Sequence, residues 1–228
     1  MTSFRQRLSK TSISVSSAKK VLVLNRKGGA GKSTFVMGLA SAAAAYGASV
    51  NVIDFDIQGS SSFWAKRCKG IHTQQYNPAR RTFSEISQTL QIEKNTDLVI
   101  FDTPSNFQEL DLERYLRFSD AIIIPMQPSP IDVHSILNFL KVLIASPTYR
   151  QKKQPISFVA TRCHHNDNHF PLFNRVLGKM KYPILGVMND DKRYQTAFEL
   201  GLNMLKSFDN LDNALWETVL AEIELKKQ

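Results

Sequence analysis

Residues 25–34 of the chain read Asn-Arg-Lys-Gly-Gly-Ala-Gly-Lys-Ser-Thr and lie between an apolar run of strand length and a helical stretch. Glycines here let the backbone curl so that successive amides face inward, and the following helix adds the positive end of its dipole. Gly-Lys-Ser between a strand and a helix is the context of a phosphate-binding loop. The chain must therefore fold so that a buried strand leads directly into a helix around an anion.

The rest of the chain alternates short apolar runs with helical stretches. Apolar runs without polar alternation indicate strands buried on both faces, and the helices between them indicate parallel crossovers. The pattern predicts an α/β fold with a doubly wound, mostly parallel sheet, helices on both faces and a ligand at the carboxyl ends of the strands. Strands are expected at residues 21–25, 49–54, 98–102, 121–125, 156–161 and 184–188, and helices at 33–46, 81–91, 107–118, 131–144, 170–180, 194–200 and 210–225.

Length and composition suit one domain. The 228 residues are 43% hydrophobic, and no apolar stretch approaches the roughly 20 residues of a membrane span. Two distant cysteines fit a reducing cytosol. We expect a single domain over residues 19–228. Residues 1–18 are basic, rich in serine and free of acids, which predicts a flexible N-terminal arm, with an organelle transit peptide as the alternative.

The net charge of +9 indicates a polyanionic partner, either nucleic acid or an acidic membrane surface. Residues 141–193 carry ten bases against three acids, so much of the charge lies in the C-terminal half. Lysines and arginines there could contact DNA phosphates without reading sequence, while a solvated basic face without function remains the alternative. The candidates are Arg175, Lys179, Lys181, Lys192, Arg193 and Lys206.

The phosphate loop departs from its ordinary form. In that form, G-x-x-x-x-G-K-[ST], Lys32 would reach the β- and γ-phosphates and the Ser33 hydroxyl would hold Mg²⁺. The ordinary motif requires glycine at position 26, where this chain has Arg26. Lys27 followed by two glycines is instead the arrangement K-G-G-x-G-K-[ST], with a second lysine.

This arrangement resembles that of the ParA/MinD family of ATPases, and further segments match the family's order. The second strand ends in a segment similar to D-x-D-P-Q-G, with Ile57 in place of proline. Residues 102–104, Asp-Thr-Pro, resemble the Walker B and switch II segment, and residues 125–128 resemble P-x-Q-P. Arg193, Ala197 and Gly201 match an R-x-x-x-A-x-x-x-G spacing. The resemblance covers about residues 20–225.

The resemblance implies roles for individual residues. Lys27 would reach the partner's phosphates across a nucleotide-bridged dimer, in the manner of an arginine finger. Asp56 would orient the attacking water, and Asp102 and Asp54 would support Mg²⁺ with Ser33. Aspartates that merely cap strand ends are the alternative. The nucleotide would contact Lys27, Gly28, Gly29, Ala30, Gly31, Lys32, Ser33 and Thr34, and Arg162 would approach the base unless it is an ordinary surface arginine.

Asn25-Arg26 favours the ParA branch over the MinD branch, whose members usually have glycine before the second lysine. The short N-terminal arm leaves no room for a DNA-reading domain, as in small ParA-type proteins. MinD-like proteins bind membrane through a basic amphipathic last helix. Here the apolar stripe of residues 210–225 is accompanied by glutamates, which indicates core packing.

These observations predict a slow, partner-stimulated ATPase that uses ATP and Mg²⁺. The ATP-bound form would be a sandwich homodimer that binds DNA non-specifically in the cytoplasm, at the nucleoid. A cognate adaptor, ParB-like or linked to a cargo, would stimulate hydrolysis and drive partition of a plasmid or chromosome, or positioning of a protein cargo. The alternatives are a MinD-like membrane-cycling regulator of cell division or polar site placement, and a scaffold without ATPase activity.

Overall fold

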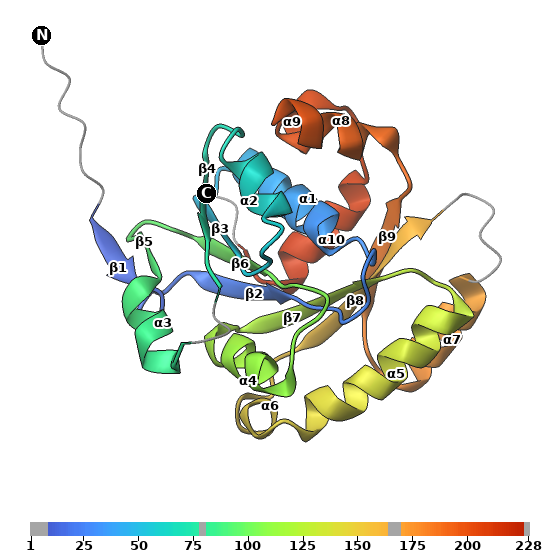
Figure 1. The fold of residues 1–228 in the computed structure, drawn as a ribbon. Helices are drawn as coiled ribbons and strands as arrows, with labels where there is room; N and C mark the ends of the chain where they lie inside the picture. Colours follow the sequence, from blue (N-terminus) through green and yellow to red (C-terminus); the bar gives the residue numbers. More distant parts are fainter. Residues whose placement is uncertain (1–8, 78–80, 164–169, 226–228) are drawn as a thin grey trace, which may run out of the picture.

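A parallel sheet of seven strands runs through the centre of the protein (Figure 1). The computed structural model describes residues 9–77, 81–163 and 170–225. Neighbouring strands are all parallel, in the order β4-β3-β6-β2-β7-β8-β9. The strand that enters the phosphate loop, β2, therefore lies in the middle of the sheet. The strands are β2 (Lys19–Val23), β3 (Val50–Asp54), β4 (Ile71–Gln75), β6 (Leu98–Asp102), β7 (Ala121–Met126), β8 (Ile156–Cys163) and β9 (Ile184–Asn189).

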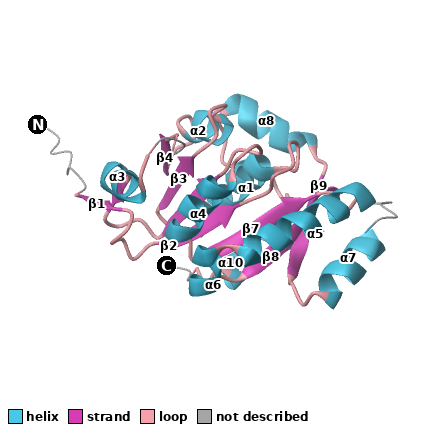
Figure 2. Ribbon diagram, turned by 60° about the horizontal axis from the view of Figure 1, so that its bottom comes forward, coloured by secondary structure: helices cyan, strands magenta, loops and turns pink. Residues whose placement is uncertain are grey.

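Helices cover both faces of this sheet (Figure 2). One apolar layer packs α1 (Lys32–Ala45), α2 (Ser60–Ala65), α8 (Lys192–Leu200), α9 (Met204–Ser207) and α10 (Asn213–Glu222). The other packs α3 (Phe83–Thr89), α4 (Glu109–Phe118), α5 (Pro130–Ala145), α6 (Pro147–Lys152) and α7 (Phe170–Lys179). The predicted doubly wound α/β fold is confirmed. None of the helices in the described ranges is long and apolar enough to cross a bilayer.

Several elements were not predicted. Strand β4 reads Ile-His-Thr-Gln-Gln and has one buried residue, because it lies at the edge of the sheet and shares only β3 as a neighbour. An edge strand needs no continuous apolar run, so its sequence looks like a loop. The helices α2, α6 and α9 are only four to six residues long, too short to show a 3.6-residue period.

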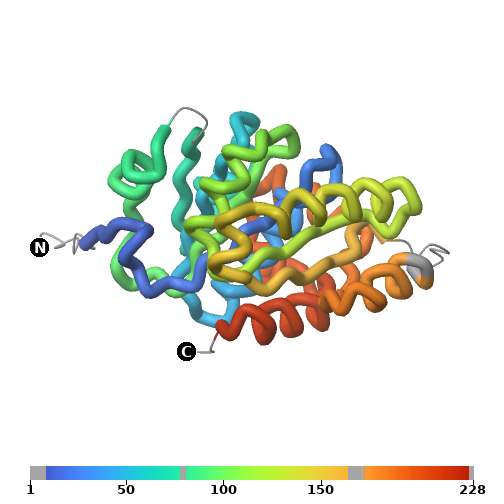
Figure 3. The backbone as a smooth tube through the Cα atoms, turned by 90° about the horizontal axis from the view of Figure 1, so that it is seen from below, coloured from blue at the N-terminus to red at the C-terminus, as the bar shows by residue number. Residues whose placement is uncertain are grey.

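The prediction of a flexible arm over residues 1–18 is wrong for its described part. Strand β1 (Lys10–Ser12) pairs antiparallel with β5 (Gln91–Glu93), and the two segments lie side by side in Figure 3. Ile13 follows β1 and is fully buried in the α3–α7 layer. The Ser12 hydroxyl also donates to the Ser87 carbonyl at 2.6 Å. One buried isoleucine and three paired residues thus order a segment whose composition indicates disorder. The expectation for residues 1–8 lies outside the described residues.

The last helix, α10, packs against the centre of α1. Trp216 is fully buried, its ring lies 5.5 Å from that of Phe35, and its indole N–H donates to the Leu211 carbonyl. Gly38 leaves the space that the indole fills, since a Cβ at that position would overlap the ring. The predicted core packing of this helix is confirmed: its apolar stripe faces the protein interior rather than a membrane surface.

Candidate functional site

The phosphate loop joins the end of β2 to the start of α1. Gly29 and Gly31 have φ values of 74° and 81°, a region that side chains rarely adopt, which explains the glycines here. From β8, the Thr161 hydroxyl donates to the Ala30 carbonyl at 3.0 Å, and its side chain lies against Gly31. Ser33 and Thr34 are half-buried in the first turn of α1. The loop is thus held in a curled form, with the helix N-terminus behind it, as anion binding requires.

The second lysine of the loop, Lys27, is held by a buried carboxylate. Its Nζ lies 2.8 Å from Asp132 Oδ2, and Asp132 is only 3% exposed. Ser129, the N-cap residue of α5, donates its hydroxyl to the same carboxylate. The loop is also fixed through Asn25, whose amide nitrogen donates to the Pro125 carbonyl while its oxygen accepts from Lys27 N. The lysine predicted to act on a partner's nucleotide is therefore bound within its own chain.

A buried carboxylate pair lies beside the loop. Asp54 and Asp102 end the adjacent strands β3 and β6 and are direct partners in the register. Asp102 is 1% exposed, and neither of its carboxylate oxygens makes a hydrogen bond of good geometry within the described ranges, although the Ser33 and Ser61 hydroxyls lie close enough to lower its pKa. Burial, with the Asp54 charge adding to it, raises the pKa of Asp102 to about 7, and Ser33, Ser61 and Lys32 offset part of that rise. Two buried, unpaired carboxylate oxygens beside Ser33 fit the ligand set that Mg²⁺ prefers.

Lys32 is buried against this carboxylate pair. Its side chain reaches the Lys27 carbonyl at 3.4 Å, and burial lowers the pKa of its ammonium, against the opposing charges of Asp102 and Asp56. The structure therefore brings together the predicted phosphate-binding lysine and the predicted metal-supporting aspartate. An anion bound in the loop would add to the negative charge of Asp102 and Asp56 and so favour the charged form of Lys32.

Asp54 and Asp56 differ in environment. Asp54 is fully buried and accepts from the Asp56 and Ser62 amides and from the Ser61 hydroxyl at 2.8 Å. Burial raises the pKa of Asp54 despite these bonds. These hydrogen bonds show that Asp54 fixes the turn after β3. Asp56 is half-buried, and the Gln75 side chain donates to the carbonyls of residues 56 and 57.

A cavity of about 250 Å³ opens on the other side of the loop. Gly31 and Thr34 form one wall, and Arg162 on β8 lies at its rim with a left-handed backbone, φ 53°. The remaining lining comes from the end of β9 and the start of α8, namely Met188, Asn189, Asp190, Asp191, Tyr194 and Gln195. The position of this cavity, outside the carboxyl ends of β8 and β9 and next to the phosphate loop, fits the base of a nucleotide.

The six basic residues predicted to contact DNA do not form one patch. Arg175, Lys179 and Lys181 are exposed on or after α7, which packs on one face of the sheet. Lys192 and Lys206 are exposed on α8 and α9, which pack on the opposite face (Figure 1). Arg193, the third predicted DNA contact on the α8–α9 side, forms a 2.7 Å ion pair with Asp191 and donates to the Asp209 carbonyl. Its guanidinium has partners within the chain.

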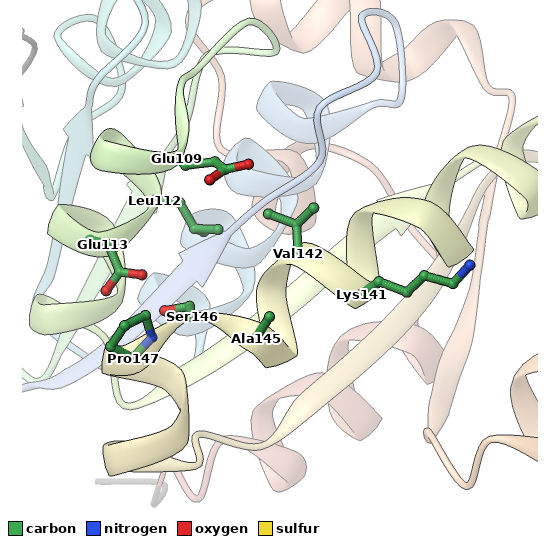
Figure 4. Close-up of a pocket in the computed structure, with 8 residues that line it drawn as sticks. All are labelled: Glu109, Leu112, Glu113, Lys141, Val142, Ala145, Ser146 and Pro147. Atoms are coloured by element: carbon green, nitrogen blue, oxygen red, sulfur yellow. The ribbon is translucent and has the colours of Figure 1, made fainter.

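A separate hollow of about 340 Å³ lies between α4 and the α5–α6 turn (Figure 4). Glu109 and Glu113 line one side and Lys141 stands at the other. It contains none of the residues predicted for the nucleotide, and it lies away from the phosphate loop. Its larger volume does not make it the functional site.

Sequence reasoning missed two side chains that hold the loop. Asp132 binds Lys27, and Thr161 braces the turn at residues 30–31. A signal existed for Asp132, because Ser-Pro-x-Asp directly after a strand end is a helix N-terminus at the carboxyl edge of the sheet. Thr161 carried no such signal, since a threonine near the end of an apolar strand is common.

A comparison with protein families matches residues 21–204 to the CobQ/CobB/MinD/ParA nucleotide-binding domain. A curated relative, the maintenance of carboxysome distribution protein A of Gloeobacter kilaueensis, is 35% identical over 113 residues. That match spans 50% of this chain and 51% of the relative, so the chain spans about half the length of the curated relative it matches.

Solved structures share the fold at lower identity. A putative plasmid partition protein of Borrelia burgdorferi bound to AMPPNP is 22% identical with a TM-score of 0.66, over 92% of this chain and all of that one. A variant of Cyanothece McdA in complex with ATP gives 0.71 at 16% identity, over 93% and 99%. MinD of Pyrococcus horikoshii with Mg-ADP gives 0.69 at 16%, over 92% and 96%. The resemblance predicted from the sequence is confirmed.

Proposed function

The chain belongs to the CobQ/CobB/MinD/ParA family of nucleotide-binding domains, and from this premise we propose that it is a Mg²⁺-dependent ATPase of the ParA type that positions a cargo. One observation carries the proposal: the buried Asp102 carboxylate makes no hydrogen bond of good geometry to the described residues, and it stands beside Lys32 and the Ser33 and Ser61 hydroxyls at a curled phosphate loop. An unpaired buried carboxylate is costly unless a cation or donor completes it. Mg²⁺ carried by a nucleotide would supply that cation.

The residues of the loop divide the chemistry among them. Lys32 and the amides of residues 28–34 would hold the β- and γ-phosphates, and Ser33 with Asp102 would hold Mg²⁺. When bound, Mg²⁺ neutralises phosphate charge during transfer of the γ-phosphoryl group to water. Asp56, half-buried on the turn after β3, would orient that water. Asp54 would fix this turn through the Ser61 and Ser62 donors.

Hydrolysis would require a homodimer in which Lys27 acts across the interface. In the present structure Lys27 is paired with Asp132, so it would have to exchange this carboxylate for the phosphates of the partner's ATP. The exchange is favourable where the phosphates present more negative charge than a single carboxylate. Slow hydrolysis without a partner protein follows, because the lysine has a competing ligand in its own chain.

We further propose that the ATP-bound dimer binds DNA without sequence preference and associates with the nucleoid in the cytoplasm. The excess of bases over acids supports this, and a cognate adaptor, ParB-like or linked to the cargo, would then stimulate hydrolysis. The relatives named for carboxysome distribution and for plasmid partition support cargo positioning as the purpose of the cycle. The cargo would be a plasmid, a chromosome region or a protein assembly. The MinD-like alternative is disfavoured, because the apolar stripe of α10 is buried.

The test is a Lys27→Ala variant. We expect ATP binding to persist, while Mg²⁺-dependent phosphate release in the presence of duplex DNA falls at least tenfold, because the removed charge acts on the transition state. Lys69→Ala, at an exposed lysine of the α2–β4 turn, is the control and should leave the rate unchanged. Sedimentation of both variants with ATP reports dimer formation. Full turnover by Lys27→Ala would contradict the trans-acting role.

A further inference from the structure

Asn189, the last residue of β9, presents its side chain in one orientation only. Its amide nitrogen donates to Asp212 Oδ1 at 2.6 Å, and its backbone N–H donates to Asp212 Oδ2 at 3.0 Å. An ionised carboxylate accepts hydrogen bonds and cannot donate them, so Asp212 must face the amide NH₂ and not the amide oxygen. The carboxylate therefore turns the Asn189 oxygen away from itself, and that oxygen accepts no hydrogen bond from the described residues.

The Asp212 side chain orients Asn189 and does not cap a helix. It is the N-cap residue of α10, but its side chain makes no capping bond. Its backbone has φ 53° and ψ 35°, a left-handed conformation that aspartate adopts more readily than most L-residues. The carboxylate instead accepts from Asn189 and, at 2.7 Å, from the Tyr194 hydroxyl. Both of those residues line the cavity beside the phosphate loop, and Asn189 also lines a hollow next to Asp212 at the start of α10.

Among the described lining residues, Asn189 has the acceptor that a neighbouring carboxylate orients, while the Thr34 hydroxyl and the Gln195 amide can each donate or accept. Arg162 offers only donors, which suit the ring nitrogens of a purine. Asp191, which could accept from a guanine N1–H and N2 amino group, is engaged by the Arg193 guanidinium, whereas the exposed Asp190 also lines the cavity. The Asn189 oxygen is the acceptor that Asp212 leaves available. An acceptor at this position can bind the 6-amino group of adenine, which donates, but it repels the 6-carbonyl oxygen of guanine, which also accepts.

We propose that Asn189 and Asp212 form a base-selecting pair, in which Asp212 orients the Asn189 oxygen to accept from the 6-amino group of adenine and thereby favours adenine over guanine. This inference rests on the proposed function, since it assigns the cavity to the base of the bound nucleotide. Asn189 would touch the base, whereas Asp212 acts only by positioning Asn189.

The experiment measures equilibrium affinities of three triphosphates with Mg²⁺: ATP, GTP and purine riboside triphosphate, which is ATP without its 6-amino group. One hydrogen bond at a half-exposed site corresponds to about a tenfold change in affinity. Wild type should bind ATP about tenfold more tightly than the 6-amino-free analogue, and GTP more weakly still. Asn189→Ala should weaken ATP binding and erase the difference between ATP and the analogue.

Asp212→Asn tests the positioning role. The substituted amide can donate to the Asn189 oxygen, so Asn189 is free to turn its NH₂ to the cavity, and the ratio of GTP to ATP dissociation constants should fall about tenfold. Asp209→Asn makes the same chemical change three residues earlier, at an exposed side chain, and should leave the ratio unchanged. The ratio is informative because a merely loosened fold would weaken both nucleotides alike.

The outcomes separate the two proposals. If no triphosphate binds wild type, the proposed nucleotide function fails. If ATP and GTP bind equally, or if Asn189→Ala keeps the wild-type preference for the amino group, the base-selecting pair is refuted while the nucleotide function stands. Should Asp212→Asn fail to fold, as circular dichroism would show, the Asn189→Ala measurement still decides the assignment of the acceptor.

Discussion

At the scale of single residues, the site contains charges that the folded chain alone does not balance. Asp102 has a pKa raised to about 7 because it is buried beside Asp54, whereas an aspartate in an unfolded chain titrates near 4. Folding therefore disfavours its ionised form. The protein tolerates this cost at a position where a bound cation would remove it, which is typical of functional sites.

A pH dependence follows for the nucleotide-free protein. Between pH 4 and pH 7 the folded state holds the Asp102 proton more tightly than the unfolded state, so the free energy of unfolding falls as the pH rises through this range. Urea denaturation should give a wild-type decrease from pH 5 to pH 8 that exceeds that of Asp102→Asn by about 2 kcal/mol. Asp120→Asn, at an exposed aspartate, is the control. Equal pH slopes in wild type and Asp102→Asn would refute the assignment.

Most residues of the site follow from sequence because their chemistry is local. The glycines, Lys32 and Ser33 sit in one short loop, and Asp54 and Asp102 end strands that parallel pairing brings to one edge. Their partners are not local. Asp132 lies 105 positions from Lys27 and Asp212 lies 23 positions from Asn189, so only the folded chain shows which carboxylate meets which donor.

At the scale of elements, α10 completes the core above α1, and substitutions at the contact between the two helices show how tightly that core is filled. Gly38→Ala should lower the free energy of unfolding by about 2–4 kcal/mol, because the added methyl group overlaps the Trp216 ring. In a Trp216→Leu background the smaller side chain leaves room, and the same substitution should cost less than about 1 kcal/mol. Chemical denaturation of the four proteins gives the interaction energy. Additive effects would mean that the two residues do not touch.

The β1–β5 ribbon gives a second test at this scale. Ile13→Ala should lower the free energy of unfolding by about 2–4 kcal/mol, since Ile13 is fully buried. Val15→Ala, two positions later, removes an apolar side chain that is 76% exposed and should change stability by less than about 0.5 kcal/mol. Similar small effects for both would favour the flexible arm that the composition predicts.

Elements with a strong local signal were predicted and the others were not. Strand β6 is a continuous apolar run up to its final aspartate, β3 is apolar before its aspartate except at Asn51, and α5 has a Ser-Pro start and a helical period, so their positions follow from the sequence. Strand β1 has no apolar residue within it, and its order depends on hydrogen bonds to β5 and on one side chain beyond its end. Such order arises from tertiary contacts, which composition does not contain.

At the scale of the whole molecule, the predicted DNA contacts divide between opposite faces, and one face should dominate. Lys192 starts α8 directly after Asp191, which lines the cavity proposed for the nucleotide base, so we expect the lysines on the α8–α9 side to respond to ATP. We expect Lys192→Glu with Lys206→Glu to weaken binding to a duplex about tenfold in the ATP state and to reduce its salt dependence.

The matched variant reverses Arg175, Lys179 and Lys181 on the α7 side and should change the affinity less than twofold. Fluorescence anisotropy with a labelled duplex across several salt concentrations measures both variants. A larger loss from the α7 variant would move the DNA surface to the opposite face of the sheet. Equal affinities in the ADP and ATP states would contradict a nucleotide-controlled switch.

The bracing of the phosphate loop has a consequence for biosynthesis. The loop leaves the ribosome early, but the Pro125 carbonyl that binds Asn25 and the Thr161 hydroxyl that binds Ala30 follow 100 and 131 positions later. At about 5–20 residues per second, translation of that interval takes roughly 7–26 s. A nascent chain thus carries the complete nucleotide motif for many seconds before it can hold its shape, and ATP would recognise only chains whose synthesis has passed β8.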